Sequence, residues 1–203
     1  MAFWGAPLEN AQHARHALLA ALEMQKRCAP LNQRLAARGW PMLRIGIGVN
    51  SGTVRVGDMG SRLRRAYTAM GDAVNVASRL EGRTKSYGVG ILAGEATRVL
   101  AKDMVFREID RVRVKGKDEA ITIYEPLGLE SEAAAARDEL RLWNQVLRAY
   151  RAQQWDDAAV SLLNLQRMNP GSGLYVAYSK KIDLLRRTPP PPDWDGVAVF
   201  DEK

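Results

Sequence analysis

The sequence has a single cysteine, Cys28, and no long apolar run. A single cysteine excludes an internal disulfide, and its apolar neighbours at helical spacing favour burial over reactivity. No stretch approaches the roughly 20 consecutive apolar residues that a membrane-spanning helix needs, and the first residues lack the basic start and apolar core of a signal peptide. We therefore expect a folded protein in the cytoplasm.

The basic residues are spread along the chain rather than gathered in one block. The 203 residues carry a formal net charge of +7, and 46% of them are hydrophobic, which is enough for one domain with an appendage. A positive charge would suit a nucleic acid, an anionic membrane surface or a polyphosphate ligand. Because no basic stretch is interleaved with aromatic residues, we do not expect nucleic acid as a partner.

The segment 1–128 alternates between helix and strand patterns, which predicts an α/β domain with a mixed sheet. Apolar residues recur at helical spacing in three segments, 9–37, 72–87 and 95–101. Pro30 is expected to kink or divide the first of these helices. Strand patterns cover "LRRAYTAM", "VGILAG" and a hairpin of residues 105–114 and 120–124 around "KGKDE". The apolar residues 1–4, followed by a Gly-Ala-Pro turn, resemble the end of a strand.

The stretch "MLRIGIGVNSGTVRVGDMG" predicts a hairpin that turns at Asn50 to Gly52. Gly46 and Gly48 suggest part of a dinucleotide-binding fingerprint. The third glycine of that fingerprint is misplaced, and a strand follows where a helix should begin. We therefore do not interpret these glycines as a dinucleotide site.

The composition changes after Gly128, and the segment 129–187 is helical in period, with breaks at 153–155 and 169–173. Five residues match the spacing of a tetratricopeptide unit to within one position: Trp143, Tyr150, Ala159, Leu163 and Pro170. One such unit with a third helix is too small to stand alone, so it should pack on the first domain or offer a groove to a partner. Residues 188–203 form a proline-rich spacer and an apolar tail, which we expect to dock back onto the protein through Trp194, Val197, Val199 and Phe200.

The helix expected at 72–87 has Asn75 and Arg79 four residues apart, so both project from one face. Small residues around them, Ala73, Ala77 and Ser78, would let a ligand lie close to the helix. An Asn and an Arg are also common on solvated helix faces, so the pair alone leaves both interpretations open.

The pair belongs to a longer pattern. The stretch "LRIGIGVNSGTVRVGDMGSRLRRAYTAMGDAVNVASRLE", followed by "VKGKDEAITIYE", resembles the catalytic domain of the class III nucleotide cyclases from Met1 to about Leu127. The resemblance implies an α/β (α+β), ferredoxin-like cyclase fold with a mixed, largely antiparallel sheet flanked by helices, plus a C-terminal helical hairpin region. The tail ending in "DWDGV" is similar to the segment that follows this domain in bacterial cyclases that carry a sensor and membrane helices ahead of it. The resemblance is therefore compatible with a membrane anchor in a part of the parent protein outside this chain.

The resemblance also implies roles for individual residues. The reaction is attack of the ribose 3′-hydroxyl on the α-phosphate with loss of pyrophosphate; Arg79 would stabilise the developing charge and Asn75 would orient the ribose. Lys115 in "VKGK" matches the lysine that contacts the triphosphate, although a lysine in a turn is otherwise expected in solvent. Thr68 lies where the family reads the purine edge, and its hydroxyl can accept a hydrogen bond from the adenine amino group, which favours ATP over GTP. A strand threonine without a ligand is the alternative.

No metal ligands are assigned. Asp58, after a strand, is interpreted as a turn residue, and Asp72 as a residue at a helix start. In the family two aspartates bind Mg²⁺ or Mn²⁺, one on the first strand and one in a Gly-Asp pair just ahead of "MAFWG", and neither is in this chain. The lysine that helps to recognise adenine is absent as well. We therefore expect that the first strand and the metal-binding part of the domain precede this sequence.

The function expected from the resemblance is that of the C-terminal portion of an adenylate cyclase, which forms cyclic AMP and pyrophosphate from ATP in intracellular signalling. Sites of this family form between two subunits, so this chain would supply the transition-state and base-recognition half as a homodimer or as a heterodimer with another cyclase subunit. Alone it should have negligible activity. The alternative is a non-catalytic, cyclase-like regulatory or dimerisation module whose helical tail binds a partner protein.

Overall fold

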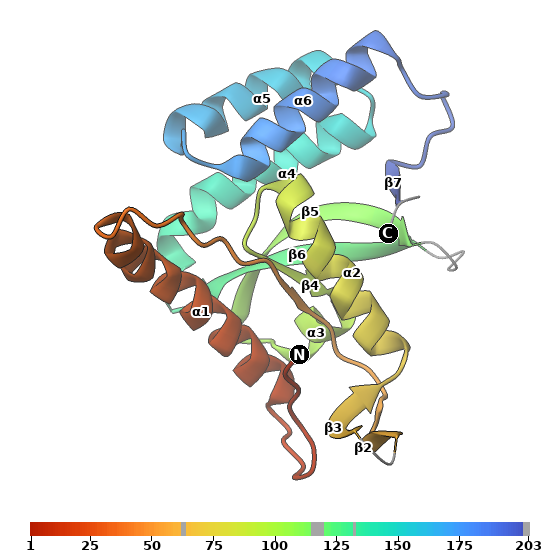
Figure 1. The fold of residues 1–203 in the computed structure, drawn as a ribbon. Coiled ribbons are helices and arrows are strands. Elements are labelled where there is room, and N and C mark those ends of the chain that lie inside the picture. Colours follow the sequence, from red (N-terminus) through yellow and green to blue (C-terminus); the bar gives the residue numbers. More distant parts are fainter. Residues whose placement is uncertain (62–63, 115–119, 132, 201–203) are drawn as a thin grey trace.

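A five-stranded mixed sheet forms the centre of the computed structural model, which describes residues 1–61, 64–114, 120–131 and 133–200 (Figure 1). In spatial order its strands are β1 (Ile47–Val49), β4 (Ile91–Gly94), β6 (Ala120–Leu129), β5 (Met104–Val114) and β7 (Val197–Phe200). β1 is parallel to β4, β6 is antiparallel to β4 and β5, and β7 is parallel to β5. This architecture confirms the mixed α/β fold class, and the β5–β6 hairpin confirms the predicted one.

A separate two-stranded sheet consists of β2 (Arg55–Ser61) and β3 (Arg64–Met70). The predicted hairpin around Asn50 to Gly52 is therefore wrong, because β1 pairs in parallel with β4 and β2 pairs forward with β3. The physical reason is length: β2 and β3 match over seven residues each, whereas β1 has three. Asp58 lies within β2 opposite Tyr67, so its assignment to a turn is also corrected.

Three helices belong to the first part of the chain: α1 (His13–Ala36), α2 (Asp72–Tyr87) and α3 (Glu95–Leu100). α2 has the predicted bounds and ends at Gly88, which has a left-handed φ of 66° that suits glycine. α1 begins later than expected, at His13, and continues through Pro30 as one helix. Of the two outcomes predicted for Pro30, a kink or a division of the helix, the division is wrong. In Figure 1, α2 runs from the β2–β3 hairpin towards the C-terminal helices.

Gly46 and Gly48 explain why α2 lies so close to the sheet. A Cβ on Gly48 would lie 2.5 Å from the backbone nitrogen of Glu81, and one on Gly46 would lie 3.2 Å from the carbonyl oxygen of Glu81. Real Cβ atoms do not occur at the first of these distances, so the backbone of α2 packs directly on this segment. The glycine pattern in the sequence serves this helix–sheet contact.

The C-terminal helical region packs on β5. It consists of η1 (Ala133–Ala136), α4 (Arg137–Arg151), α5 (Trp155–Met168) and α6 (Gly173–Arg187), with breaks where they were predicted. The Nε1 of the fully buried Trp143 donates a hydrogen bond to the carbonyl oxygen of Glu108 at 2.5 Å, and the hydroxyl of Tyr178 donates to that of Ile109 at 2.5 Å. Apolar side chains from α2, β5 and these helices share one buried cluster. Of the two expectations, packing on the first part of the chain is what the structure has.

The two ends of the described chain differ. The docking of the tail is confirmed for Trp194 and Val197: β7 pairs with β5, Val197 is buried, and the ring of Trp194 lies 5.3 Å from that of Tyr150. The side chains of Val199 and Phe200 lie outside the described part of the chain. Residues 1–12, all of them described, form neither helix nor strand, so the strand end predicted at 1–4 is wrong. Gly5 has a φ of 91°, which turns the chain away, and Phe3 packs on Tyr67 of β3 instead.

Within the described ranges, no helix has both the length and the apolar character needed to cross a bilayer.

Candidate functional site

α2 places Asn75 and Arg79 on one exposed face. The buried face of this helix is formed by Val76, Leu80, Thr84 and Tyr87. Asn75 and Arg79 lie on the other side and are exposed, so both amide and guanidinium groups are open to a ligand or a partner subunit. The small side chains between them would let a ligand approach the backbone of the helix closely at this point.

Thr68 lies on β3, which runs directly into α2. The strand ends at Met70 and the helix begins at Asp72, so the position of Thr68 is tied to the start of the helix. Thr68 is half-buried and faces Gly57 across the hairpin, where the partner strand offers no side chain. The structure therefore puts Thr68, Asn75 and Arg79 on two consecutive elements. Lys115 lies outside the described residues.

A hollow of about 300 Å³ lies beside the first turn of α2, and sequence reasoning did not find it. It is lined by residues of the β1–β2 connection, of α2, of the β4–α3 junction and of β6: Asn50, Ser51, Gly52, Thr53, Asp72, Ala73, Val76, Gly94, Glu95, Ala96 and Ile121. Asn50 fixes one wall, because its Nδ2 donates a hydrogen bond to the carbonyl oxygen of Ala73 at 3.1 Å. Neither Asn75 nor Arg79 is among the lining residues, so the candidate face is a surface and not part of this hollow.

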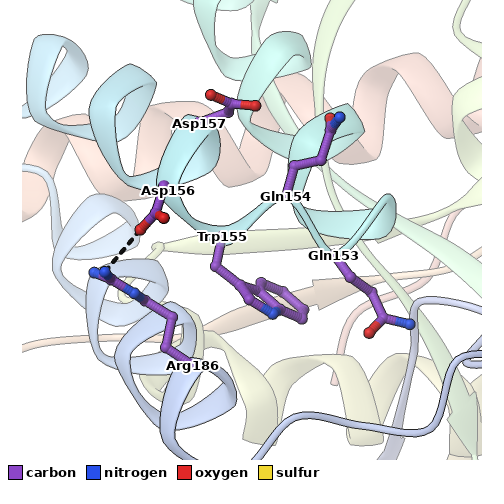
Figure 2. Close-up of a pocket in the computed structure, with 6 residues that line it drawn as sticks. All are labelled: Gln153, Gln154, Trp155, Asp156, Asp157 and Arg186. Carbon is purple, nitrogen blue, oxygen red and sulfur yellow. Dashed lines mark ion pairs between the residues drawn. The ribbon is translucent and has the colours of Figure 1, made fainter.

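A second hollow, of about 460 Å³, lies in the helical region between the α4–α5 turn and α6 (Figure 2). Its lining residues are Gln153, Gln154, Trp155, Asp156, Asp157 and Arg186. Figure 2 shows Arg186 and Asp156 pointing towards each other, and their ion pair measures 2.7 Å. Both side chains are largely exposed, so the pair contributes little to stability, and the hollow is far along the chain from Asn75 and Arg79.

The buried end of α2 meets a buried carboxylate. The hydroxyl of Tyr87 donates a hydrogen bond to Oδ2 of Asp110, on β5, at 2.7 Å. Burial first, and then the charge of Asp110, raise the pKa of Tyr87 far above its ordinary value, so this hydroxyl stays a donor. The sequence carries no sign of this contact, because Asp110 is one acidic residue in a strand of mixed polarity.

The described residues do not fit a metal centre. Over residues 1–61, 64–114, 120–131 and 133–200, no three His, Cys, Asp or Glu side chains are grouped so that they would hold a metal ion. Asp58 is exposed on β2, and Asp72 is the first residue of α2. The groups that the exposed face of α2 offers to a ligand are the amide of Asn75 and the guanidinium of Arg79.

The sequence matches a known family model over residues 1–124, the adenylate and guanylate cyclase catalytic domain. It is 44% identical over 129 residues to adenylate cyclase 1 of Rhizobium meliloti (strain 1021), a match that covers 63% of this chain and 19% of that relative. The chain thus spans about a fifth of that relative's length.

Solved structures match the same part of the chain. The adenylyl cyclase CyaB from P. aeruginosa has 32% sequence identity and a TM-score of 0.56, covering 62% of this chain and 64% of that one. The guanylyl cyclase Cya2 has 30% identity and a TM-score of 0.57, covering 64% of this chain and 66% of that one. One of these structures is an adenylyl and the other a guanylyl cyclase, so the fold leaves the purine open.

Proposed function

The chain belongs to the adenylate and guanylate cyclase catalytic-domain family, and we propose that it serves cyclic AMP synthesis from ATP by supplying the transition-state and base-recognition half of an adenylate cyclase site. The observation that carries the proposal is the exposed face of α2, where Asn75 and Arg79 lie four residues apart, directly after the strand that holds Thr68. The relative with 44% identity is named an adenylate cyclase, which agrees with this substrate.

The residues of this face suit the charge that develops in the reaction. When the ribose 3′-hydroxyl attacks the α-phosphate and pyrophosphate leaves, negative charge grows on the phosphate oxygens. Arg79 is an exposed, permanently charged guanidinium that can donate hydrogen bonds to those oxygens, and the amide of Asn75 can hold the ribose in line for attack. Lys115 is proposed to contact the terminal phosphates.

Thr68 is proposed to read the purine. Its hydroxyl oxygen is able to accept a hydrogen bond from the exocyclic amino group of adenine, whereas guanine presents a carbonyl at the same edge. The hydroxyl is free to rotate, so recognition of adenine by Thr68 alone is modest. We propose ATP as the substrate, with GTP as the competitor to be measured.

The site is proposed to be completed by a second subunit. Asn75 and Arg79 lie on an exposed face of the single chain, and no described group of side chains fits the divalent ions that the family uses. We infer that carboxylates of a partner cyclase subunit face this surface, in a heterodimer that holds one hybrid site. In this division, residues 1–128 are the catalytic part, 129–187 a tetratricopeptide-like region and 188–203 a spacer and tail.

The test is complementation. The purified chain is mixed with a metal-competent class III cyclase in which the matching Asn and Arg are replaced by Ala, and cyclic AMP formation from ATP is measured. Neither protein alone should be active, and the mixture should be. A chain with Asn75→Ala and Arg79→Ala is the matched control and should restore nothing.

A second function is suggested by the side chains of the described residues, among which no group could hold a metal ion. In it the chain is a non-catalytic module that dimerises with a full cyclase and regulates it, and its helical tail binds a partner protein. Tight association in the same mixture, with inhibition or with no cyclic AMP, would support this function and contradict the first.

A further inference from the structure

The last turn of α2 is in backbone contact with the first residue of α6. A Cβ on Gly173 would lie 2.5 Å from the carbonyl oxygen of Gly88 and 2.9 Å from its Cα. Only hydrogen atoms fit between the two glycines, so the end of the helix that carries Asn75 and Arg79 rests directly on the helical region. In Figure 1 this contact is where α2 reaches the C-terminal helices.

A buried carboxylate ties the same two helices together. Oδ2 of Asp110, on β5, accepts a hydrogen bond from the hydroxyl of Tyr87 at 2.7 Å and another from the ammonium of Lys181, on α6, at 2.6 Å. The side chain of Asp110 is 1% exposed and that of Lys181 28% exposed. One oxygen atom therefore joins α2, β5 and α6.

The environment of Lys181 keeps this junction charged. Its ammonium lies 5.0 Å and 5.3 Å from the ring centres of Tyr150 and Tyr178, within the range of cation–π attraction. Burial alone would lower the pKa of Lys181, but the charge of Asp110, with smaller contributions around it, outweighs burial and raises that pKa. Loss of Lys181 would leave the buried carboxylate of Asp110 without its ion-pair partner, although it would keep the hydrogen bonds from Tyr87 and from the backbone nitrogen of Arg111.

The geometry of α2 makes its buried end a lever. α2 also touches Gly46 and Gly52, but its closest backbone contact is with Gly48, on either side of Arg79, so small motions of the helix pivot there. Tyr87 lies about 12 Å beyond the pivot and Asn75 about 6 Å on the other side, at 1.5 Å per residue. A shift of about 2 Å at the Tyr87 end thus moves Asn75 by about 1 Å, and misplacement of that size typically costs a reaction about a hundredfold.

We propose that Asp110 and Lys181 are positioning residues for cyclization, which hold the end of α2 on the helical region and thereby set the place of Asn75. The helical region is then part of the catalytic unit and not only an appendage. The expected effect on the rate of cyclization rests on the proposed function. The link between α2 and α6 through Asp110 does not depend on it.

The variant that tests the link is Lys181→Met, which keeps much of the aliphatic stem and removes the charge. Arg186→Met is the matched control, because Arg186 lies on the same helix and its ion pair with Asp156 is exposed. Hydrogen exchange of the α2 backbone amides in the purified chain should be at least tenfold faster in Lys181→Met and unchanged in Arg186→Met. Tyr87→Phe removes the hydrogen bond to Asp110 without leaving a charge unpaired and should give a smaller increase in the same amides.

The kinetic measurement uses the complementation mixture. Lys181→Met should lower kcat by about tenfold with little change in KM for ATP, and Lys181→Arg should recover most of the loss. Exchange in α2 that is equal in all variants, or that rises uniformly over the whole chain, would overturn the proposal. A mixture that is inactive even with the unaltered chain would refute the proposed function, and the exchange measurement would still decide the link.

Discussion

Gly48 of β1 packs against Ala77 of α2 so closely that the carbonyl oxygen of Ala77 occupies the space of a Cβ. The contact sets the distance between the helix that holds Asn75 and Arg79 and the sheet. It also means that the glycine is required by its neighbours and not by its own backbone, since no left-handed φ occurs at this position.

Replacement of Gly48 by Ala should therefore destabilise the protein, because an added methyl group must push α2 off the sheet. Overpacking of this kind costs about 1–3 kcal/mol. Gly57→Ala is the matched control, since Gly57 lies in a strand with open space around its Cβ position. Urea denaturation of the two variants measures the difference; equal midpoints would show that α2 tolerates the shift.

The bounds of α2 and the pairing of β5 with β6 could be predicted from the sequence, because both depend on local signals. Gly88 marks the end of the helix, and the patterns of the two strands follow each other closely in the sequence. The partner of β1 could not be predicted in this way. β1 pairs with β4, which is distant in sequence, and the choice depends on α2 covering both strands.

The candidate site was predictable in part for the same reason. Asn75 and Arg79 share a face through helical spacing alone, and the structure places them there. The link from Tyr87 through Asp110 to Lys181 joins three elements that are far apart in sequence, so no spacing or motif indicates it. The roles of the predicted residues in binding and catalysis stay predictions.

Removal of Arg79 should slow the chemical step. In the complementation mixture, Arg79→Ala should lower kcat by roughly a hundredfold, the usual cost of about 3 kcal/mol for one preorganised donor to a developing negative charge. KM for ATP should change much less, because the interaction strengthens in the transition state. Lys85→Ala removes an exposed cation from the last turn of the same helix and should leave kcat unchanged. An equal loss in both variants would mean that the positive charge of α2 as a whole, and not a specific contact of Arg79, supports the reaction.

Replacement of Thr68 by Val should weaken the preference for ATP. The two side chains have nearly the same shape, so the change removes one hydrogen bond, worth up to about 1.5 kcal/mol or roughly tenfold in binding. KM for ATP should rise by up to that factor, and Thr68→Ser should stay close to the unaltered chain. Initial rates with ATP and with GTP provide the measurement, and a Val variant with unchanged KM for ATP would remove Thr68 from the base site.

The junction of α2, β5 and α6 should make the fold sensitive to alkali. The pKa of Lys181 is raised above 10.5, and burial raises the pKa values of Tyr87, Tyr150 and Tyr178 above 10.0. For a group whose folded pKa is raised, the unfolded chain loses its proton first as pH increases. The stabilisation from these groups is thus complete below about pH 10 and is lost as the pH rises through their folded pKa values.

The free energy of unfolding, measured in urea at increasing alkaline pH, should therefore fall from about pH 10 upward. Lys181→Arg should flatten part of that fall, because a guanidinium stays charged throughout this range. The tyrosinate absorbance of the buried rings should appear together with loss of helical circular dichroism, since those hydroxyls ionise when the junction opens. Ionisation of all tyrosines while the helices remain intact would contradict the closed junction around Asp110.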